Sequence, residues 1–169
     1  CEMCIRDRSM MAHYHYKDWP VEAVENGSAL SLGNGKTVHF METRMLHWPD
    51  SMVSYVAEDK LLISSDAFGQ NIASTERFDD QLDLSELLDL AGHYYANIVI
   101  PYSPLVLKVL DKIKAAGLEI DMIAPDHGAI WRSHTDKIIA AYARWAAQKA
   151  LAAKAVNTSL TVRNWLIGH

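Results

Sequence analysis

The sequence of 169 residues has no long hydrophobic run and no excess of positive charge. No apolar stretch reaches the roughly 18 residues that a helix needs to cross a bilayer, and the N-terminus carries no signal-peptide pattern. The formal net charge is −5, with lysine and arginine scattered, which is unlike a nucleic-acid-binding surface. The composition therefore predicts a cytoplasmic protein with no nucleic-acid and no membrane partner. Half of the residues are hydrophobic, enough for the core of one globular domain.

Cysteine is nearly absent: the chain has only Cys1 and Cys4. A C-x-x-C pair can form a metal knuckle or a redox pair, but no second pair follows and no βαβ pattern surrounds it. Residues 2–8, EMCIRDR, also back-translate to GAG ATG TGT ATA AGA GAC AGR, which resembles a transposon-end sequencing adapter read in frame. We therefore expect residues 1–8 to be non-native and the chain to be a fragment of a longer protein.

Two strand–turn–strand units are predicted in the first half of the chain. Residues 21–42 have an extended pattern, and Asn34-Gly35 between two alternating runs is a strong hairpin signal. Residues 51–66 form the second unit, with its turn at Glu58-Asp59. The continuous apolar run at 61–63 predicts a strand that is buried on both faces.

The second half of the chain is predicted to be mainly helical. A helix over 83–98 has Asp83 as its expected N-cap, and Pro101 marks the break that follows it. A second helix ends at Gly117, residues 118–125 form a short strand, and a last helix begins near Thr135. Strands followed by helices that return to a strand indicate a layered α/β domain.

Three polar residues follow predicted strands at equivalent positions. His47 comes after the strand that ends near residue 42, Asp66 ends the strand 61–65, and His127 follows the strand 118–124. Because the carboxyl ends of strands gather at one edge of such a sheet, these side chains could meet there. Two imidazoles and a carboxylate are good ligands for zinc, iron or manganese. Taken singly, a histidine in a loop is more often solvated or hydrogen-bonded than a ligand, and an aspartate at a strand end often caps a turn.

The amino-acid sequences of five segments extend this interpretation. MLHWPDSM, SSDAFGQ, RFDD, YYANI and APDHGAIWR occur in an order and spacing that resemble the flavodiiron proteins, also called A-type flavoproteins, over roughly residues 11–150. The resemblance implies the C-terminal part of a metallo-β-lactamase-like αββα sandwich, truncated, in residues 9–153. Residues 154–169 would be an unmatched tail where a flavodoxin-like domain begins.

The resemblance also implies a role for each candidate residue. Asp66 would bridge two iron ions, with His47 as a terminal ligand on one and His127 on the other. The intact protein would reduce O2 to water or NO to N2O. It would carry FMN as a cofactor, receive electrons from a rubredoxin-like or flavin donor, and form a head-to-tail homodimer. Trp48 would lie against the partner's flavin or pack in the core. Asp126 would orient the neighbouring imidazole or be solvated.

Two departures from the family pattern are visible. The upstream H-x-E-x-D-H motif is absent, and the segment HYHYKD at 13–18 has Lys17 and Asp18 where aspartate and histidine are required. We therefore interpret His13 and His15 as surface residues. The tail VNTSLTVRNWLIGH lacks a glycine-rich phosphate loop, so no FMN site is expected in this chain. The fragment alone is expected to bind iron weakly and to be inactive.

Two other functional classes stay open. A dinuclear metal hydrolase of the same fold would use a metal-bound water on a thioester, lactone or phosphodiester. A non-catalytic domain that has lost its metal site would serve only in assembly. The remaining histidines at 39, 93 and 134 are predicted to be structural, with His134 close to the cap of the last helix.

Overall fold

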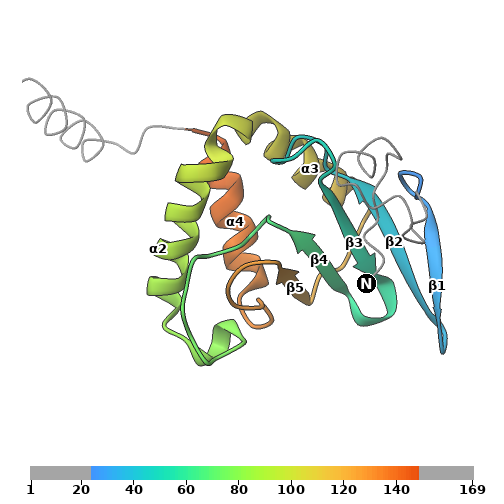
Figure 1. The fold of residues 1–169 in the computed structure, drawn as a ribbon, viewed down its shortest axis with the longest axis horizontal. Helices are drawn as coiled ribbons and strands as arrows, with labels where there is room; N and C mark the ends of the chain where they lie inside the picture. The colour runs from blue at the N-terminus through green and yellow to red at the C-terminus, as the bar shows by residue number, and fades with distance from the viewer. Residues whose placement is uncertain (1–23, 149–169) are drawn as a thin grey trace, which may run out of the picture.

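The strands of the protein form one mixed sheet, and its α-helices pack on one side of that sheet (Figure 1). The computed structural model describes residues 24–148, so Cys1, Cys4, the HYHYKD segment and the tail lie outside the described residues. The strands are β1 (Ala29–Gly33), β2 (Lys36–Glu42), β3 (Met52–Val56), β4 (Leu61–Ser65) and β5 (Met122–Pro125). The α-helices are α2 (Leu84–Tyr94), α3 (Ser103–Ala115) and α4 (Thr135–Ala146).

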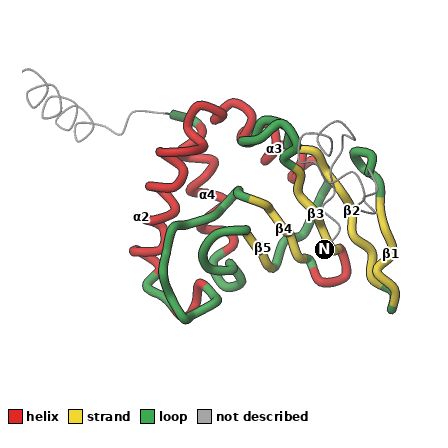
Figure 2. Tube along the Cα trace, in the orientation of Figure 1, coloured by secondary structure: helices red, strands yellow, loops and turns green. Residues whose placement is uncertain are grey.

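The order of the sheet is β1-β2-β3-β4-β5 (Figure 2). Neighbours from β1 to β4 are antiparallel, whereas β4 and β5 are parallel. Strands β2, β4 and β5 therefore run in the same direction, and their carboxyl ends lie at the same edge of the sheet. The expectation that these strand ends share one edge is confirmed.

Both predicted turns of the first half are present. Asn34 and Gly35 have φ values of 52° and 78°, the left-handed conformations that a tight hairpin between β1 and β2 requires. Between β3 and β4 the chain forms a 3₁₀ turn at Ala57–Asp59, which Lys60 closes with a φ of 48°.

Two details of the sheet differ from the prediction. Leu62 is fully buried, but Ile63 is 40% exposed, so β4 is not buried on both faces within the described structure. Strand β5 begins only at Met122, because the Asp121 and Met122 amides both donate to the Lys60 carbonyl and residues 118–121 approach the sheet as a loop. Apolar character alone did not reveal where strand pairing starts.

The helices cover one face of the sheet and complete the main core. Leu87, Ala91 and Tyr94 of α2 are buried, as the predicted stripe requires, and Asp83 caps the helix by accepting from the Glu86 amide at 2.9 Å. The chain then continues as a π-helix (Tyr95–Val99) and a 3₁₀ turn (Ile100–Tyr102), which contains Pro101, before α3 begins. Among the described helices, none is long and apolar enough to span a membrane.

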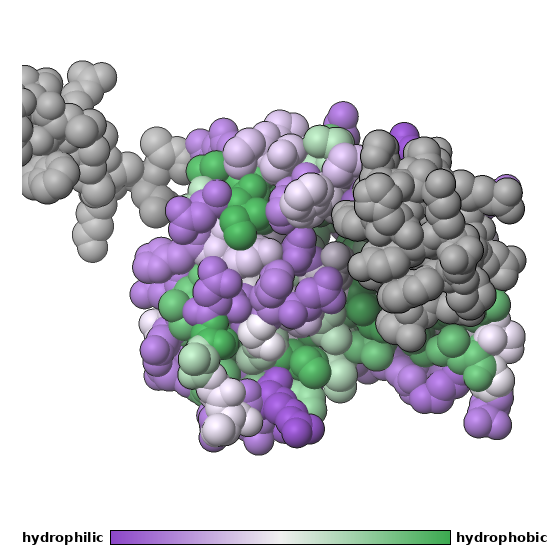
Figure 3. Space-filling view, in the orientation of Figure 1, coloured by the Kyte–Doolittle hydropathy of each residue, from purple (hydrophilic) through white to green (hydrophobic). Residues whose placement is uncertain are grey.

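The opposite face of the sheet carries a smaller apolar cluster of Val38, Phe40 and Val56. On the side shown in Figure 3, apolar and hydrophilic residues are interspersed. Exposed large apolar side chains include Leu30 and Leu32 of β1, at 45% and 55%.

Helix α4 is tied to the end of β4 by one buried hydrogen bond. The Phe68 amide donates to the Tyr142 hydroxyl at 2.8 Å, and the two rings lie 4.5 Å apart. Both residues are buried, so no water can replace the hydroxyl as an acceptor.

We therefore expect Tyr142→Phe to lower the free energy of unfolding by about 1–3 kcal/mol, because the Phe68 amide would lose its acceptor. Urea denaturation of the purified protein measures this change. In the control Tyr55→Phe, the Glu119 carbonyl loses its hydroxyl donor, but Glu119 is exposed and water can replace that donor, so the loss should stay below about 1 kcal/mol. Equal losses in the two variants would contradict the assignment.

Candidate metal centre

Three side chains meet at the carboxyl edge of the sheet. Nε2 of His47 lies 2.9 Å from Oδ2 of Asp66, and Nε2 of His127 lies 3.1 Å from Oδ1 of the same carboxylate. The side chains of His47 and Asp66 are 22% and 19% exposed, whereas that of His127 is 52% exposed. The three residues singled out in the sequence are therefore brought together, with Asp66 between the two imidazoles.

The two imidazoles contact opposite sides of the Asp66 carboxylate. In the part of the chain that the structure describes, no three histidine, cysteine, aspartate or glutamate side chains form a group that could hold a metal ion. The contacts of Asp66 give a reason, because the two imidazoles face different oxygens of its carboxylate rather than one common point. Such an arrangement suits a carboxylate shared between two positions better than a single mononuclear site.

His47 is positioned by a loop that closes on itself between β2 and β3. The Thr43 amide donates to the Ser51 carbonyl at 2.9 Å, and the Met45 amide donates to the Trp48 carbonyl at 2.8 Å. Leu46 is buried in the main core and anchors the loop from inside. The peptide bond between Leu46 and His47 is cis.

The loops that carry Asp66 and His127 are fastened to each other by Gln70. This side chain is 1% exposed, and its amide group donates to the carbonyls of Phe68 and Ala129 while its oxygen accepts from the Ala129 amide. The backbone amide of Gln70 also donates to the His127 carbonyl at 3.2 Å. Because Gln70 pairs with both loops, the distance between Asp66 and His127 is set by the fold.

A buried carboxylate that the sequence reasoning missed supports the same region. Asp79 is fully buried and accepts from the amides of Arg132, Ser133 and His134, and also lies 2.9 Å from Nδ1 of His134. Its neighbour Asp80 pairs with the Arg132 guanidinium at 3.0 Å. The RFDD segment marked these positions, but spacing alone did not show that the first carboxylate organises the loop before α4.

Tyrosine rings flank both imidazoles. The Tyr94 ring lies 5.9 Å from the His127 ring between centroids, and the Tyr102 ring lies 6.5 Å from that of His47. Burial, followed by the negative charges of Asp66 and Asp126, raises the pKa of Tyr94 to about 12. Tyr94 is therefore neutral at physiological pH.

The other two candidate residues, Trp48 and Asp126, occupy different surroundings. Trp48 is 58% exposed, so it does not pack in the core of the described structure, and its ring lies 5.8 Å from that of His47. Asp126 accepts from the Ser65 hydroxyl at 3.3 Å, and its amide donates to the Ser65 carbonyl. The contacts of Asp126 thus fasten the loop after β5 to the end of β4.

The remaining described histidines lie apart from this group. His39 is exposed on β2, and His93 lies in the last turn of α2, where its carbonyl accepts from Asn97. His134 is the N-cap residue of α4, close to where the sequence placed it.

Comparison with known proteins decides the family. Residues 3–128 match the sequence model of the ODP family beta lactamases. The chain belongs to this family.

Curated relatives of this ODP-family chain are named as an oxidoreductase and a reductase. The rubredoxin-oxygen oxidoreductase of Megalodesulfovibrio gigas is 51% identical over 144 residues, covering 84% of this chain and 36% of the relative. The nitric oxide reductase of Moorella thermoacetica is 51% identical over 138 residues, covering 82% of this chain and 34% of the relative. The ODP-family chain therefore spans about a third of the length of these relatives.

Solved structures agree with the sequence comparison. The rubredoxin oxygen:oxidoreductase from Desulfovibrio gigas superposes with a TM-score of 0.81 at 50% identity, over 85% of this chain and 36% of that chain. The flavodiiron protein from Giardia intestinalis gives 0.76 at 35% identity, over 81% and 33%. The predicted resemblance to flavodiiron proteins is confirmed, as is the predicted α/β, metallo-β-lactamase-like fold class.

Gly128 allows the His127 loop to approach Gln70. It has a φ of +84°, and a Cβ added there would lie 2.6 Å from the Gln70 carbonyl oxygen and closer still to its side-chain oxygen. Gly117 has a similar φ of +63° but open space around it. Substitutions at the two glycines therefore separate the cost of a left-handed backbone from the cost of a steric clash.

We expect Gly117→Ala to destabilise the protein by about 1–2 kcal/mol through its left-handed backbone. Gly128→Ala should add a further cost of about 1–3 kcal/mol, because the new methyl group must displace Gln70. Urea unfolding of the two variants measures the difference. Equal destabilisation would show that Gln70 does not hold the His127 loop.

Proposed function

We propose that this chain is the part of a flavodiiron oxidoreductase that supplies three ligands of a diiron centre. In this proposal Asp66 would be shared between the two irons, with His47 as a ligand of one and His127 as a ligand of the other. The observation that carries the proposal is that the two oxygens of one carboxylate each lie about one hydrogen-bond length from a different imidazole, at 2.9 and 3.1 Å.

The donor set fits this metal. Imidazole and carboxylate both suit iron among the divalent transition metals, and an anionic carboxylate between two cations reduces their repulsion. When bound, the diiron centre would transfer electrons from the external donor to the gas and offer electrophilic positions where the gas binds. His127 lies on the more open side of the group, while His47 and Asp66 are better shielded from water.

The substrates follow from the relatives. One is named a rubredoxin-oxygen oxidoreductase and another a nitric oxide reductase. We infer that the full-length protein reduces O2 to water or NO to N2O, with a rubredoxin-like or flavin electron donor. These names favour redox chemistry over the hydrolase alternative, and the convergence of three potential ligands disfavours the assembly-only alternative.

We place the FMN outside this chain, in another part of the full-length protein. Trp48 offers a contact for it, because its ring is exposed at 58% and adjoins His47. In a head-to-tail homodimer, this surface would face the flavin of the partner subunit. A cytoplasmic location, the non-native origin of residues 1–8, the domain limits at 9–153 and the unmatched tail at 154–169 stay predictions.

The variant Asp66→Asn tests the bridging role in the full-length protein. Asparagine keeps the shape of the side chain but removes its charge, so we expect bound iron to fall at least about tenfold. Gas reduction should be lost with it. Iron content per chain, measured by elemental analysis, is the direct readout.

The matched control is Asp50→Asn, which makes the same chemical change in the loop that carries His47. Asp50 is half-buried, and we expect this variant to keep its iron. A wild-type iron content in the Asp66 variant would refute the proposed ligand.

A further inference from the structure

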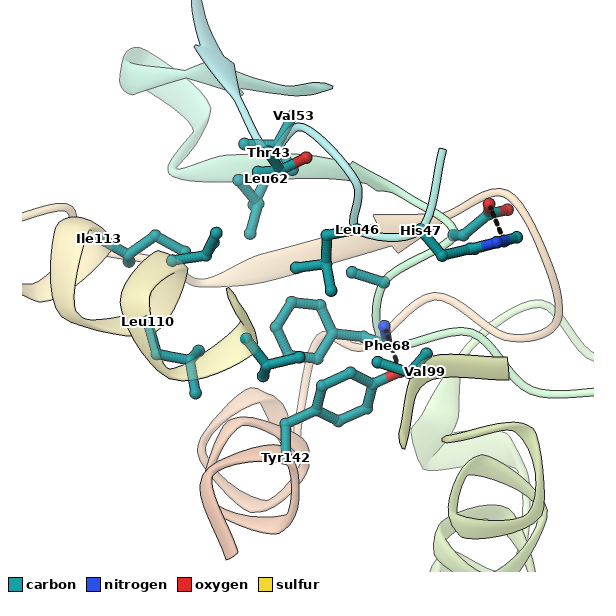
Figure 4. A pocket seen from close by; sticks show the side chains of 14 residues that line it. Thr43, Leu46, His47, Val53, Leu62, Phe68, Val99, Leu110, Ile113 and Tyr142 are labelled. Carbon is teal, nitrogen blue, oxygen red and sulfur yellow. Dashed lines mark hydrogen bonds and ion pairs between the residues drawn. The ribbon is translucent and has the colours of Figure 1, made fainter. Parts of the chain in front are cut away.

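A small cavity lies directly behind the candidate metal centre. Its volume is about 20 Å³, and His47 and Asp66 are among the fourteen residues that line it. Figure 4 shows His47 at one side of the cavity and Leu110 and Ile113 of α3 at the opposite side. The cavity thus leads from the site into the core between the sheet and the helices.

The wall of the cavity is almost entirely apolar. Ten of its fourteen lining residues carry purely apolar side chains. Val53 and Leu62 come from the sheet, Val106 and Leu110 come from α3, and the Phe68 ring lies between these layers (Figure 4). His47 and Asp66, which belong to the metal centre, are two of the four polar residues.

The size of the cavity admits one small molecule. One water needs roughly 10–15 Å³ by the same measure of cavity volume, together with 2–4 polar partners. The other two polar residues, Thr43 and Tyr142, add little polar surface to a cavity wall that is almost entirely apolar, and the Tyr142 hydroxyl already accepts one hydrogen bond, from the Phe68 amide at 2.8 Å. An apolar wall therefore disfavours water and favours a molecule that is poorly hydrated in solution.

We propose that this cavity binds a single small apolar diatomic molecule, O2 or NO, next to the metal centre. The identity of the gas rests on the proposed function, whereas the preference for a small apolar guest rests on the cavity alone. Because such gases are weakly hydrated, the cavity would hold them at the inner side of His47 and Asp66.

Xenon tests the cavity without any turnover. It is apolar, close in size to a diatomic gas, and visible by its anomalous scattering in pressurised crystals of the full-length protein. We expect one xenon atom between Val106 and Phe68. In the variants Val106→Ile and Val109→Ile, which each add a methyl group to the wall on α3, the xenon peak should be lost.

The matched control is Val56→Ile, which adds the same methyl group to the apolar cluster on the opposite face of the sheet. This variant should keep the xenon. In steady-state assays, the KM for the gas should rise several-fold in the α3 variants, with kcat and iron content unchanged, and should not rise in the control.

Ordered water in the wild-type cavity, absence of xenon from it, or retention of xenon in both α3 variants would overturn the proposal. Xenon in the cavity of a protein that reduces neither gas would support the binding site and refute the proposed function. Gas reduction by a protein whose cavity takes no xenon would support the proposed function and refute the binding site. Failure of the cavity proposal is therefore distinguishable from failure of the proposed function.

Discussion

The contact of one carboxylate with two imidazoles is the feature around which the described structure is organised. Asp66 meets His47 through one oxygen and His127 through the other, although these residues come from three separate connections. The contact is possible because β2, β4 and β5 run in the same direction, with β3 antiparallel between the first two. The direction of the strands thus decides which loops can share a site.

Fixed distances in the site depend on polar groups that are themselves buried. Gln70 pairs with the loops that carry Asp66 and His127, and Asp79 accepts three backbone amides of the segment before α4. A buried polar side chain is stable only when its partners are in place, so these contacts permit few alternative arrangements of the loops. The same contacts explain why a half-exposed histidine can hold a defined position.

The sequence predicted the features that have a local physical cause. Asn34-Gly35 specified the hairpin, Asp83 the start of α2, and Gly117 the end of α3, because each depends on a backbone preference or a cap. The shared edge of His47, Asp66 and His127 also followed from strand ends. In contrast, the exposure of Ile63 and the buried role of Asp79 depend on contacts between distant segments, which no local pattern encodes.

The parallel pairing of β4 with β5 places residues 66–121 between the two strands. His47 and Asp66 belong to an early part of the chain, whereas His127 follows the long crossover through α2 and α3. During synthesis, the first imidazole and the carboxylate therefore leave the ribosome before the second imidazole exists. Joining the pair across this distance carries a loop-closure cost that the packed helices and the pairing of β4 with β5 offset. A nascent chain can thus assemble half of this site early, but the complete site must wait until the crossover has folded.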